Sequence, residues 1–365
     1  MIIMKAISLF SGGGGDTSGM QEAGVDVVAY SEILDIAQQT HELNFKNTVL
    51  MGKEVKGDIT KTKNEELRNK YENVDLIFAG FPCQGFSKAG KKQQDDPRNT
   101  LFKEFVRVVN EIQPRYIIGE NVKGLLTRKT SSNEKYIDVI QQSFETIGYK
   151  TIFKICNLTD YGVPQKRERL IILGTRHDIQ PVSFPSSSLS SSSDLSLVNI
   201  VSFDMTGAIQ ITKDMYDMEN KIPEECIITD LENTETTNHP HPYLVMKANT
   251  KNATYNNIHY TSLLSFGKRD SPIHCEIINI QRPSKTIICT YDHQPRLFVP
   301  LKNKNGYFLR CLLPYELKQI QGFQKDYNFK GNIKQQILQI GNAIPPPIVC
   351  HITKHILAHH LEHTL

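Results

Sequence analysis

The fold is decided near the N-terminus, by the stretch KAISLFSGGGGDTSGM at Lys5–Met20. An apolar run ends there in four consecutive glycines, which let the backbone turn sharply and bring N–H groups close to a ligand. This order predicts a buried strand followed by a tight loop, at the strand end where open α/β sheets bind their ligands. The apolar run is too short for a signal peptide.

Strand-like and helix-like patterns alternate through the first half of the chain. Short apolar runs predict strands at 5–10, 25–32, 74–80, 115–120 and 169–174. Apolar residues at helical spacing predict helices at 34–44, 99–113 and 136–147. Short strands that alternate with amphipathic helices predict an α/β fold with a parallel, doubly wound sheet.

The character of the chain changes near residue 180. The stretch SFPSSSLSSSSDLS at 183–196 is rich in serine and cannot build a core, so it is expected to be a linker or a long surface loop. The alternation of helices and strands is then lost. We therefore expect a larger domain made of residues 1–180 plus 333–365, and a smaller, mixed domain with a hinge at 181–332.

Bulk properties exclude several classes of protein. The net charge of +3 over 365 residues permits a local basic face but does not by itself indicate nucleic-acid binding. The seven cysteines are odd in number, widely spaced and without a C-x-x-C pair, which favours a reducing compartment over a disulfide framework or zinc knuckle. No stretch approaches the ~20 apolar residues of a membrane span.

Histidines recur every four residues near the C-terminus, at His351, His355 and His359. Such a stripe can bind a metal, but no carboxylate or cysteine motif completes the ligand set. We therefore expect a polar helix face and no metal site.

The glycine loop and two acids favour a nucleoside cofactor. A dinucleotide fingerprint, G-x-G-x-x-G, fails from either Gly12 or Gly13, and the G-K-[ST] ending of a P-loop is absent. Glu32, twenty residues beyond Gly12, ends the second strand and could accept both hydroxyls of a ribose. Asp58 would end the third strand and could meet an adenine amine. S-adenosylmethionine, which has no pyrophosphate, is the leading candidate, although a simple tight turn would also explain the glycines.

Cys83 lies in the loop FPCQGFS at 81–87, just after the predicted strand 74–80. Most lone cysteines only pack, and a buried thiol is inert. Here, however, the loop continues into a polar segment, and Glu120 ends the next strand in GENVKG at 119–124. Both residues are therefore expected at the ligand-binding edge of the sheet.

Six motifs in a fixed order resemble the cytosine-5 DNA methyltransferases. They are LFSGGGG at 9–15, GFPCQGFS at 80–87, ENVKG at 120–124, QKRERLIILG at 165–174, RPSKTI at 282–287 and GNAIPPPIV at 341–349. The resemblance covers the chain outside about 180–280. It implies a Rossmann-like S-adenosylmethionine-dependent methyltransferase domain with a mixed, mostly parallel sheet, and a smaller, irregular target-recognition domain. The compact length favours the prokaryotic or viral restriction-modification type.

The resemblance implies a role for four catalytic residues. Cys83 would add to carbon 6 of cytosine, so that carbon 5 can attack the methyl group of the cofactor. Glu120 would donate a proton or hydrogen bond to ring nitrogen 3 and hold the amine. Arg169 would orient the base through its carbonyl oxygen, and Arg167 would support the loop or a phosphate. The cytosine must leave the duplex stack, at a cost of roughly a few kcal/mol.

The resemblance also implies two larger sets of contacts. The pocket for S-adenosylmethionine is expected to combine Phe10, Gly12, Gly14, Gly15, Glu32, Asp58, Ile59, Pro82, Leu101 and Asn342. The DNA contacts are expected from the polar loop, at Gln84, Ser87, Lys88, Lys91 and Arg98. A solvated surface is the plain alternative for each lysine.

Three other functions were weighed. A tRNA cytosine-5 methyltransferase would share the catalytic residues, but the Cys-Phe-Thr element of that branch is absent from residues 180–300. A non-catalytic DNA-binding relative should have lost one of the four catalytic residues, and the failed dinucleotide fingerprint disfavours a nicotinamide oxidoreductase. The expected partners are duplex DNA and, by analogy, a restriction endonuclease acting on the same site. We expect a monomer without membrane contact, in the cytoplasm of a bacterium or infected host, or in the nucleus of a eukaryote.

Overall fold

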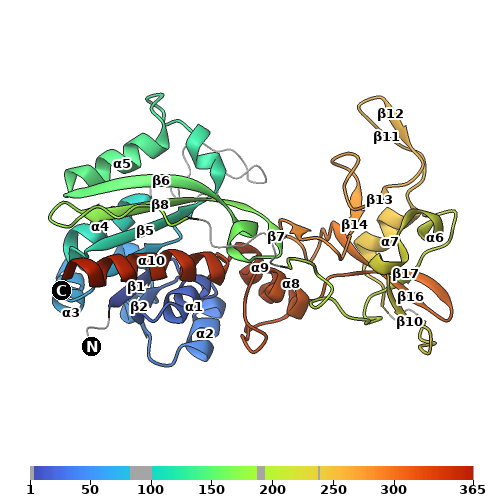
Figure 1. The fold of residues 1–365 in the computed structure, drawn as a ribbon, viewed down its shortest axis with the longest axis horizontal. Helices are drawn as coiled ribbons and strands as arrows, with labels where there is room; N and C mark the ends of the chain where they lie inside the picture. The colour runs from blue at the N-terminus through green and yellow to red at the C-terminus, as the bar shows by residue number, and fades with distance from the viewer. Residues whose placement is uncertain (1–3, 83–100, 187–193, 237–238, 365) are drawn as a thin grey trace.

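Two bodies lie side by side in the computed structural model, which describes residues 4–82, 101–186, 194–236 and 239–364 (Figure 1). The first is a seven-stranded sheet with helices on both faces, and the second is built around a six-stranded sheet. Within the described residues, no helix is long and apolar enough to cross a membrane.

The first body contains the predicted alternation. Its strands are β1 (Lys5–Leu9), β2 (Asp26–Ser31), β3 (Val49–Leu50), β4 (Leu76–Ala79), β5 (Tyr116–Asn121), β6 (Tyr149–Asn157) and β8 (Glu168–Arg176). Its helices are α1 (Gly15–Glu22), α2 (Asp35–Asn44), α3 (Asn64–Tyr71), α4 (Phe102–Ile112), α5 (Tyr136–Thr146) and α10 (Pro346–Thr364), with short 3₁₀ turns η1 (Lys53–Val55), η2 (Ile59–Lys61), η5 (Lys123–Thr127) and η6 (Leu158–Tyr161).

The strand order is β3-β2-β1-β4-β5-β8-β6, and the sheet is mixed. The first five strands in this order are parallel, whereas β8 is antiparallel to both of its neighbours. The α/β fold with a mostly parallel sheet is thus confirmed. The short connection from β6 to β8 forces the reversal, because a parallel crossover needs a dozen or more residues.

The two edge strands of this sheet were not predicted correctly: β3 ends at Leu50, so the expectation that Asp58 ends the third strand is wrong, and β6 was missed. The sheet edge is formed by β6, whose sequence YKTIFKICN mixes lysines and threonine with apolar residues. An edge strand is only half covered, so its side chains need not form the continuous apolar run by which the buried strands were recognised.

Both faces of the sheet are covered by helices. One face packs under α3, α4 and α5, with Phe105 and Phe144 fully buried between helix and sheet. The other face packs under α1 and α10, where Ile348, Ile352 and Ile356 repeat every fourth residue and are buried. The C-terminal helix therefore lies on the first body, as Figure 1 shows.

The histidines on α10 have separate partners. His359 Nδ1 lies 3.2 Å from the hydroxyl of Tyr116, and His351 Nε2 lies 3.1 Å from the carbonyl oxygen of Ser186. No group of three or more metal-ligating side chains gathers anywhere in the described ranges.

The second body is mixed, with short strands, short helices and irregular segments. Its sheet has the order β13-β14-β16-β17-β9, with β10 paired to β16, and a separate hairpin is formed by β11 and β12. The strands are β9 (Ile209–Gln210), β10 (Ile228–Asp230), β11 (Ala253–Tyr255), β12 (Ile258–Tyr260), β13 (Leu264–Phe266), β14 (Cys275–Ile277), β16 (Leu297–Asn303) and β17 (Gly306–Cys311). The helices are α6 (Met218–Lys221), α7 (Pro242–Asn249), α8 (Pro314–Ile320) and α9 (Ile333–Asn342), with the 3₁₀ turn η7 (Glu224–Cys226).

A two-stranded ladder joins the two bodies. The strand β7 (Gln165–Lys166), which precedes β8, pairs in parallel with β15 (Ser284–Lys285). The motifs QKRER and RPSKTI, more than a hundred residues apart in sequence, therefore lie side by side.

Candidate active site at the carboxyl edge of the first sheet

Residues from five strands meet at one edge of the seven-stranded sheet. The strands β1, β2, β4 and β5 are parallel, so their carboxyl ends lie together, and ligands bind at this edge in α/β sheets. Because β8 runs the opposite way, its first residues reach the same edge.

Glu120 and Arg169 form an ion pair at this edge, with 2.7 Å between Glu120 Oε1 and Arg169 Nε. In the register Glu120 faces Ile171, so Arg169 is its diagonal neighbour on the same face of the sheet. Both side chains are about one-seventh exposed, at 15% and 14%. Burial lowers the pKa of Arg169, and the Glu120 carboxylate opposes that shift. A planar fork and a carboxylate, side by side and partly exposed, can together bind a flat polar ring.

Arg167 points away from this edge and is buried, at 3% exposure. Its guanidinium donates 3.0 Å hydrogen bonds to the carbonyl oxygens of Ile287 and Gly341. The N–H of Ile287 in turn donates to Gln165 Oε1 at 2.8 Å. Ile287 is thus bonded by two side chains of the QKRER motif, Gln165 and Arg167. Burial, reinforced by the charge of Arg169, lowers the pKa of Arg167.

Asn121 fixes the approach to the predicted nucleophile. Its side chain is buried, and its amide donates a 3.1 Å hydrogen bond to the carbonyl oxygen of Phe81, directly before Pro82. Sequence reasoning missed this residue, although it adjoins Glu120 in the ENV motif. Cys83 lies outside the described residues.

All five predicted DNA contacts also lie outside the described residues, namely Gln84, Ser87, Lys88, Lys91 and Arg98.

The six cysteines within the described residues are all unpaired, and burial raises the pKa of each thiol. They are Cys156, Cys226, Cys275, Cys289, Cys311 and Cys350.

Glu32 and Gly12 meet beside the end of β1. The N–H of Gly12 donates to Glu32 Oε2 and that of Leu34 to Oε1, each at 2.8 Å. Burial raises the pKa of Glu32, and these hydrogen bonds oppose the rise. Gly12 has φ 54°, and a Cβ atom there would meet nothing within 4 Å. Phe10 also has a positive φ of 58°, which is rare for a bulky residue and common at functional sites.

The next glycines are packed against protein. A Cβ atom on Gly14 would lie 2.5 Å from Phe45 and 2.7 Å from the Tyr327 hydroxyl, and one on Gly15 would collide with the carbonyl oxygen of Ile344. The hydroxyl of Tyr327 also donates to the carbonyl oxygen of Gly13. Close packing against protein atoms therefore explains Gly14 and Gly15, whether or not a ligand binds near them.

Asp58 lies close to Glu32 in space. A Cβ atom on the preceding Gly57 would collide with the carbonyl oxygen of Glu32. Asp58 accepts hydrogen bonds from the Thr60 N–H and hydroxyl, at 3.1 and 2.7 Å, and pairs with Lys61 at 3.0 Å. Burial alone would raise the pKa of Asp58, but these contacts outweigh it and lower the pKa.

The remaining predicted cofactor residues are dispersed around this point. Ile59 is buried, and its carbonyl oxygen accepts a 2.7 Å hydrogen bond from Arg107 Nη2 on α4. Leu101 caps the N-terminus of α4, and Asn342 is the exposed last residue of α9.

A buried carboxyl group beneath the glycine loop was not foreseen. Asp16 is 2% exposed and accepts hydrogen bonds from the Ser8 hydroxyl, the Ser11 hydroxyl at 2.8 Å and the Thr17 N–H at 2.8 Å. Burial raises the pKa of Asp16 to about 6, against the effect of these donors. An acid in a first helical turn is ordinarily exposed, so the pattern around Asp16 does not indicate this role.

His41 supports the same loop from the other side. Its Nε2 lies 3.0 Å from the Thr17 hydroxyl, and its ring stacks on Tyr30 with centroids 3.5 Å apart. Burial lowers the pKa of His41 to about 3, so the ring is neutral.

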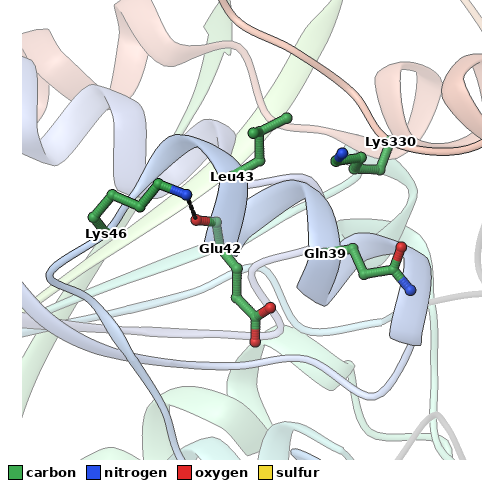
Figure 2. Close-up of a pocket in the computed structure, with 5 residues that line it drawn as sticks. All are labelled: Gln39, Glu42, Leu43, Lys46 and Lys330. Atoms are coloured by element: carbon green, nitrogen blue, oxygen red, sulfur yellow. Dashed lines mark hydrogen bonds between the residues drawn. The ribbon is translucent and has the colours of Figure 1, made fainter.

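A surface pocket of about 340 Å³ lies elsewhere, on the outer side of α2 (Figure 2). It is lined by Gln39, Glu42, Leu43, Lys46 and Lys330, and Lys46 Nζ donates to the Glu42 carbonyl oxygen at 3.1 Å. None of the predicted site residues lines it.

The chain is similar to known proteins over nearly its whole length. A family model described as C-5 cytosine-specific DNA methylase matches residues 4–358. The type II methyltransferase M.FnuDI of Fusobacterium nucleatum is 31% identical over 97% of this chain and 94% of its own length. M.DdeI of Desulfomicrobium norvegicum is 39% identical, but over 48% of this chain and 41% of its own length. The crystal structure of a Spodoptera frugiperda DNMT2 mutant has the same fold, with a TM-score of 0.62, 18% identity, and coverage of 97% of this chain and 99% of that one.

Proposed function

The chain belongs to the family of C-5 cytosine-specific DNA methylases, and we propose that it methylates carbon 5 of a flipped-out cytosine in duplex DNA through a covalent adduct at Cys83. Among the described residues, the observation that carries this proposal is the Glu120–Arg169 ion pair, which lies at the edge where the chain enters the Pro82–Cys83 loop. A partly exposed carboxylate and guanidinium suit a cytosine ring, which presents a ring nitrogen, an amine and a carbonyl oxygen.

Cys83 is the proposed nucleophile. Its thiolate would add to carbon 6, and the electron pair displaced from the 5,6 double bond makes carbon 5 nucleophilic. The six other cysteines support this choice, because each is buried or half-buried and burial raises the pKa of each thiol, which favours the unreactive protonated form. After carbon 5 is methylated, a base removes its proton and the sulfur leaves as thiolate.

Glu120 and Arg169 would bind the ring while this occurs. Glu120 would hold the amine and donate a proton or hydrogen bond to ring nitrogen 3, which stabilises the negative charge that thiolate addition brings. Arg169 would donate to the carbonyl oxygen and, through its contact with Glu120, keep that carboxyl oriented.

S-adenosylmethionine, which supplies an electrophilic methyl group when bound, is the proposed cofactor. The open space beside Gly12 supports this, as do the carboxylate of Glu32, which Gly12 contacts, and the carboxylate of Asp58, which follows a glycine packed on the Glu32 backbone. Glu32 would accept the ribose hydroxyls and Asp58 the adenine amine. We propose that Phe10, Ile59, Pro82, Leu101 and Asn342 complete the pocket, and that Gly14 and Gly15 shape its floor.

Arg167 is proposed as a positioning residue. Its two hydrogen bonds to Ile287 and Gly341 join the motif that contains Arg169 to the second body. The proposed division is a catalytic domain of residues 1–180 plus 333–365 and a target-recognition domain and hinge at 181–332, with α9 packed on the core of the second body through Ile337 and Ile340.

Duplex DNA is the proposed substrate, with Gln84, Ser87, Lys88, Lys91 and Arg98 as contacts to it. The family description specifies DNA, and this disfavours tRNA as the substrate. Relatives such as M.FnuDI are named type II methyltransferases, so a restriction endonuclease that cuts the same site is a proposed partner in a bacterial cytoplasm.

Methyl transfer from labelled S-adenosylmethionine to duplex DNA and to tRNA, run in parallel, tests the proposal. We expect label on duplex DNA only, no label with Cys83→Ser, and a covalent complex between the wild type and DNA containing 5-fluorocytosine. Cys350→Ser is the matched control, since that thiol is half-buried on α10, and should retain activity. Label on tRNA alone, or methylated DNA with Cys83→Ser, would overturn the assignment.

A further inference from the structure

The second body carries a hairpin that stands apart from its sheet. β11 and β12 pair only with each other, in the antiparallel register Ala253–Tyr260, Thr254–His259 and Tyr255–Ile258. Figure 1 shows the hairpin projecting well beyond β13, β14 and α7, on the side of the molecule where α5 lies. A ribbon that covers no core needs another reason to be ordered.

Exposed polar side chains occupy the end of this hairpin. Asn256 and Asn257 form the turn with φ of 49° and 64°, the left-handed conformation that a tight two-residue hairpin requires. Both are exposed, as are Thr254 and His259, and Ile258 is 55% exposed. The Thr254 hydroxyl and His259 Nδ1 lie 3.5 Å apart, whereas the amides of Asn256 and Asn257 have no hydrogen-bond partner among the described residues.

The base of the hairpin is held firmly. The ring of Tyr260 meets that of His274 edge to face, with centroids 4.5 Å apart, and His274 Nδ1 lies 2.8 Å from the Ser271 hydroxyl. Tyr260 therefore ties the hairpin to the segment that leads into β14. This attachment can present the tip in a fixed direction.

Charge separates sharply along the second body. Residues 241–269, which include the hairpin, contain four basic residues and no Asp or Glu. Residues 214–235 contain eight Asp or Glu and one lysine. The four basic residues are Lys247, Lys251, Lys268 and Arg269. Lys268 and Arg269 are exposed and have no hydrogen-bond or ion-pair partner among the described residues, whereas Lys251 pairs with Asp214 at 2.5 Å in an exposed bridge of little energetic weight.

We propose that the β11–β12 hairpin enters the major groove of the target duplex and reads its sequence. The major groove, about 12 Å wide, admits a two-stranded ribbon and presents a different donor and acceptor pattern for each base pair. Asn256, Asn257 and His259 would bond base edges, and Ile258 would contact a thymine methyl group. Lys268 and Arg269 would bind flanking phosphates. This inference rests on the proposed activity on duplex DNA.

The test replaces the side chains and keeps the turn. Glycine adopts a positive φ without strain, so Asn256→Gly with Asn257→Gly removes both amides but preserves the hairpin. Wild type and variant are each incubated with a randomised duplex library, and bisulfite sequencing reports the bases around each methylated cytosine. We expect the variant to lose preference at one or more positions of the target site by 10-fold or more, while its melting temperature and S-adenosylmethionine binding are unchanged.

The two basic residues Lys268 and Arg269 allow a second measurement. Each phosphate contact adds about −0.9 to the slope of log affinity against log salt, so Lys268→Ala with Arg269→Ala should make that slope shallower by about 1.8. Lys302→Ala with Lys304→Ala, at the β16–β17 turn, removes the same charge elsewhere on the second body and should leave it unchanged.

Two results would overturn the inference. One is a glycine variant with the target preference of the wild type; the other is an equal change of slope in both lysine variants. The first can be obtained only if the wild type methylates DNA, and the second only if the wild type binds DNA, so failure of the hairpin proposal is distinct from failure of the proposed function.

Discussion

Glu120 and Arg169 come from adjacent strands that run in opposite directions, and their side chains meet at 2.7 Å. The contact depends on the reversal of β8, which brings Arg169, the second residue of that strand, to the edge where the parallel strands end. Each partner therefore orients the other, and each can be removed separately.

We expect Glu120→Gln to reduce single-turnover methyl transfer by about 10²–10⁴-fold, the usual range for a general acid or base. The amide keeps the shape and a hydrogen bond to Arg169 but cannot deliver a proton. Affinity for S-adenosylmethionine, measured by calorimetry, should change less than 3-fold. Glu168→Gln, on the exposed neighbour of Arg169, is the control, and equal losses in both variants would contradict the assignment.

Arg167 should matter for stability as well as for turnover. Arg167→Met keeps the length of the side chain but leaves the carbonyl oxygens of Ile287 and Gly341 without donors, at about 1–3 kcal/mol for each buried group. Urea unfolding followed by circular dichroism measures the loss. Arg282→Met, at an exposed site, should cost less than about 0.5 kcal/mol.

The glycines of the loop should separate into two classes. Gly14→Ala forces a methyl group against Phe45 and Tyr327 and should lower the free energy of unfolding by about 1–3 kcal/mol. Gly12→Ala meets open space, so only its left-handed φ is penalised, by about 1 kcal/mol. Its methyl group would instead project toward the proposed cofactor site.

Thermal unfolding and calorimetric titration with S-adenosylmethionine distinguish the two. We expect Gly14→Ala to lower the melting temperature more, and Gly12→Ala to lower cofactor affinity more when both are measured well below melting. Equal effects on affinity would count against a ligand beside Gly12.

Asp16 should make stability depend on pH in an unusual direction. Its pKa rises from 3.8 to about 6 on folding, so the native state binds the proton more tightly than the unfolded state between these values. The stabilisation is complete below about pH 4 and is lost as pH rises through about 6, in total about 3 kcal/mol by linkage. Asp16→Asn should abolish this component.

His41 changes stability in the opposite direction, because its pKa falls from 6.5 to about 3 on folding. The prediction for Asp16 therefore concerns the difference between wild type and Asp16→Asn, in which the contribution of His41 cancels. Urea unfolding at pH 4, 5, 6 and 7 gives that difference. A difference that does not vary with pH would contradict the raised pKa.

Local patterns predicted most of the first body, and non-local pairing explains what they missed. The strand at 76–79 is uniformly apolar, the strand at 5–9 is apolar except for Lys5 and Ser8, and α4 carries a clear apolar stripe, so each is recognisable from its own residues. The edge strand β6 has no such run. The direction of β8 depends on the short connection before it, which the apolar pattern of β8 does not reveal.

The site was predicted as a set of residue types, but their orientations depend on contacts across the fold. Gln165 and Arg167 are buried whereas Lys166 and Glu168 are exposed, an alternation that is legible in the sequence. It does not reveal that Arg167 faces Ile287 rather than the reacting edge. Asp16 was missed for the same reason, since its donor Ser8 on β1 is brought to it only by folding.

The hydrogen bonds that Gln165 and Arg167 form with Ile287 limit how the two bodies can move. If the molecule opened by separating these residues, several buried polar groups would lose their hydrogen bonds at once. Each loss would cost about 1–3 kcal/mol. The second body must instead rotate about these hydrogen bonds, which act as a hinge. Binding of DNA by the second body would then be transmitted through Arg167 to Arg169, which lies two residues further along the chain.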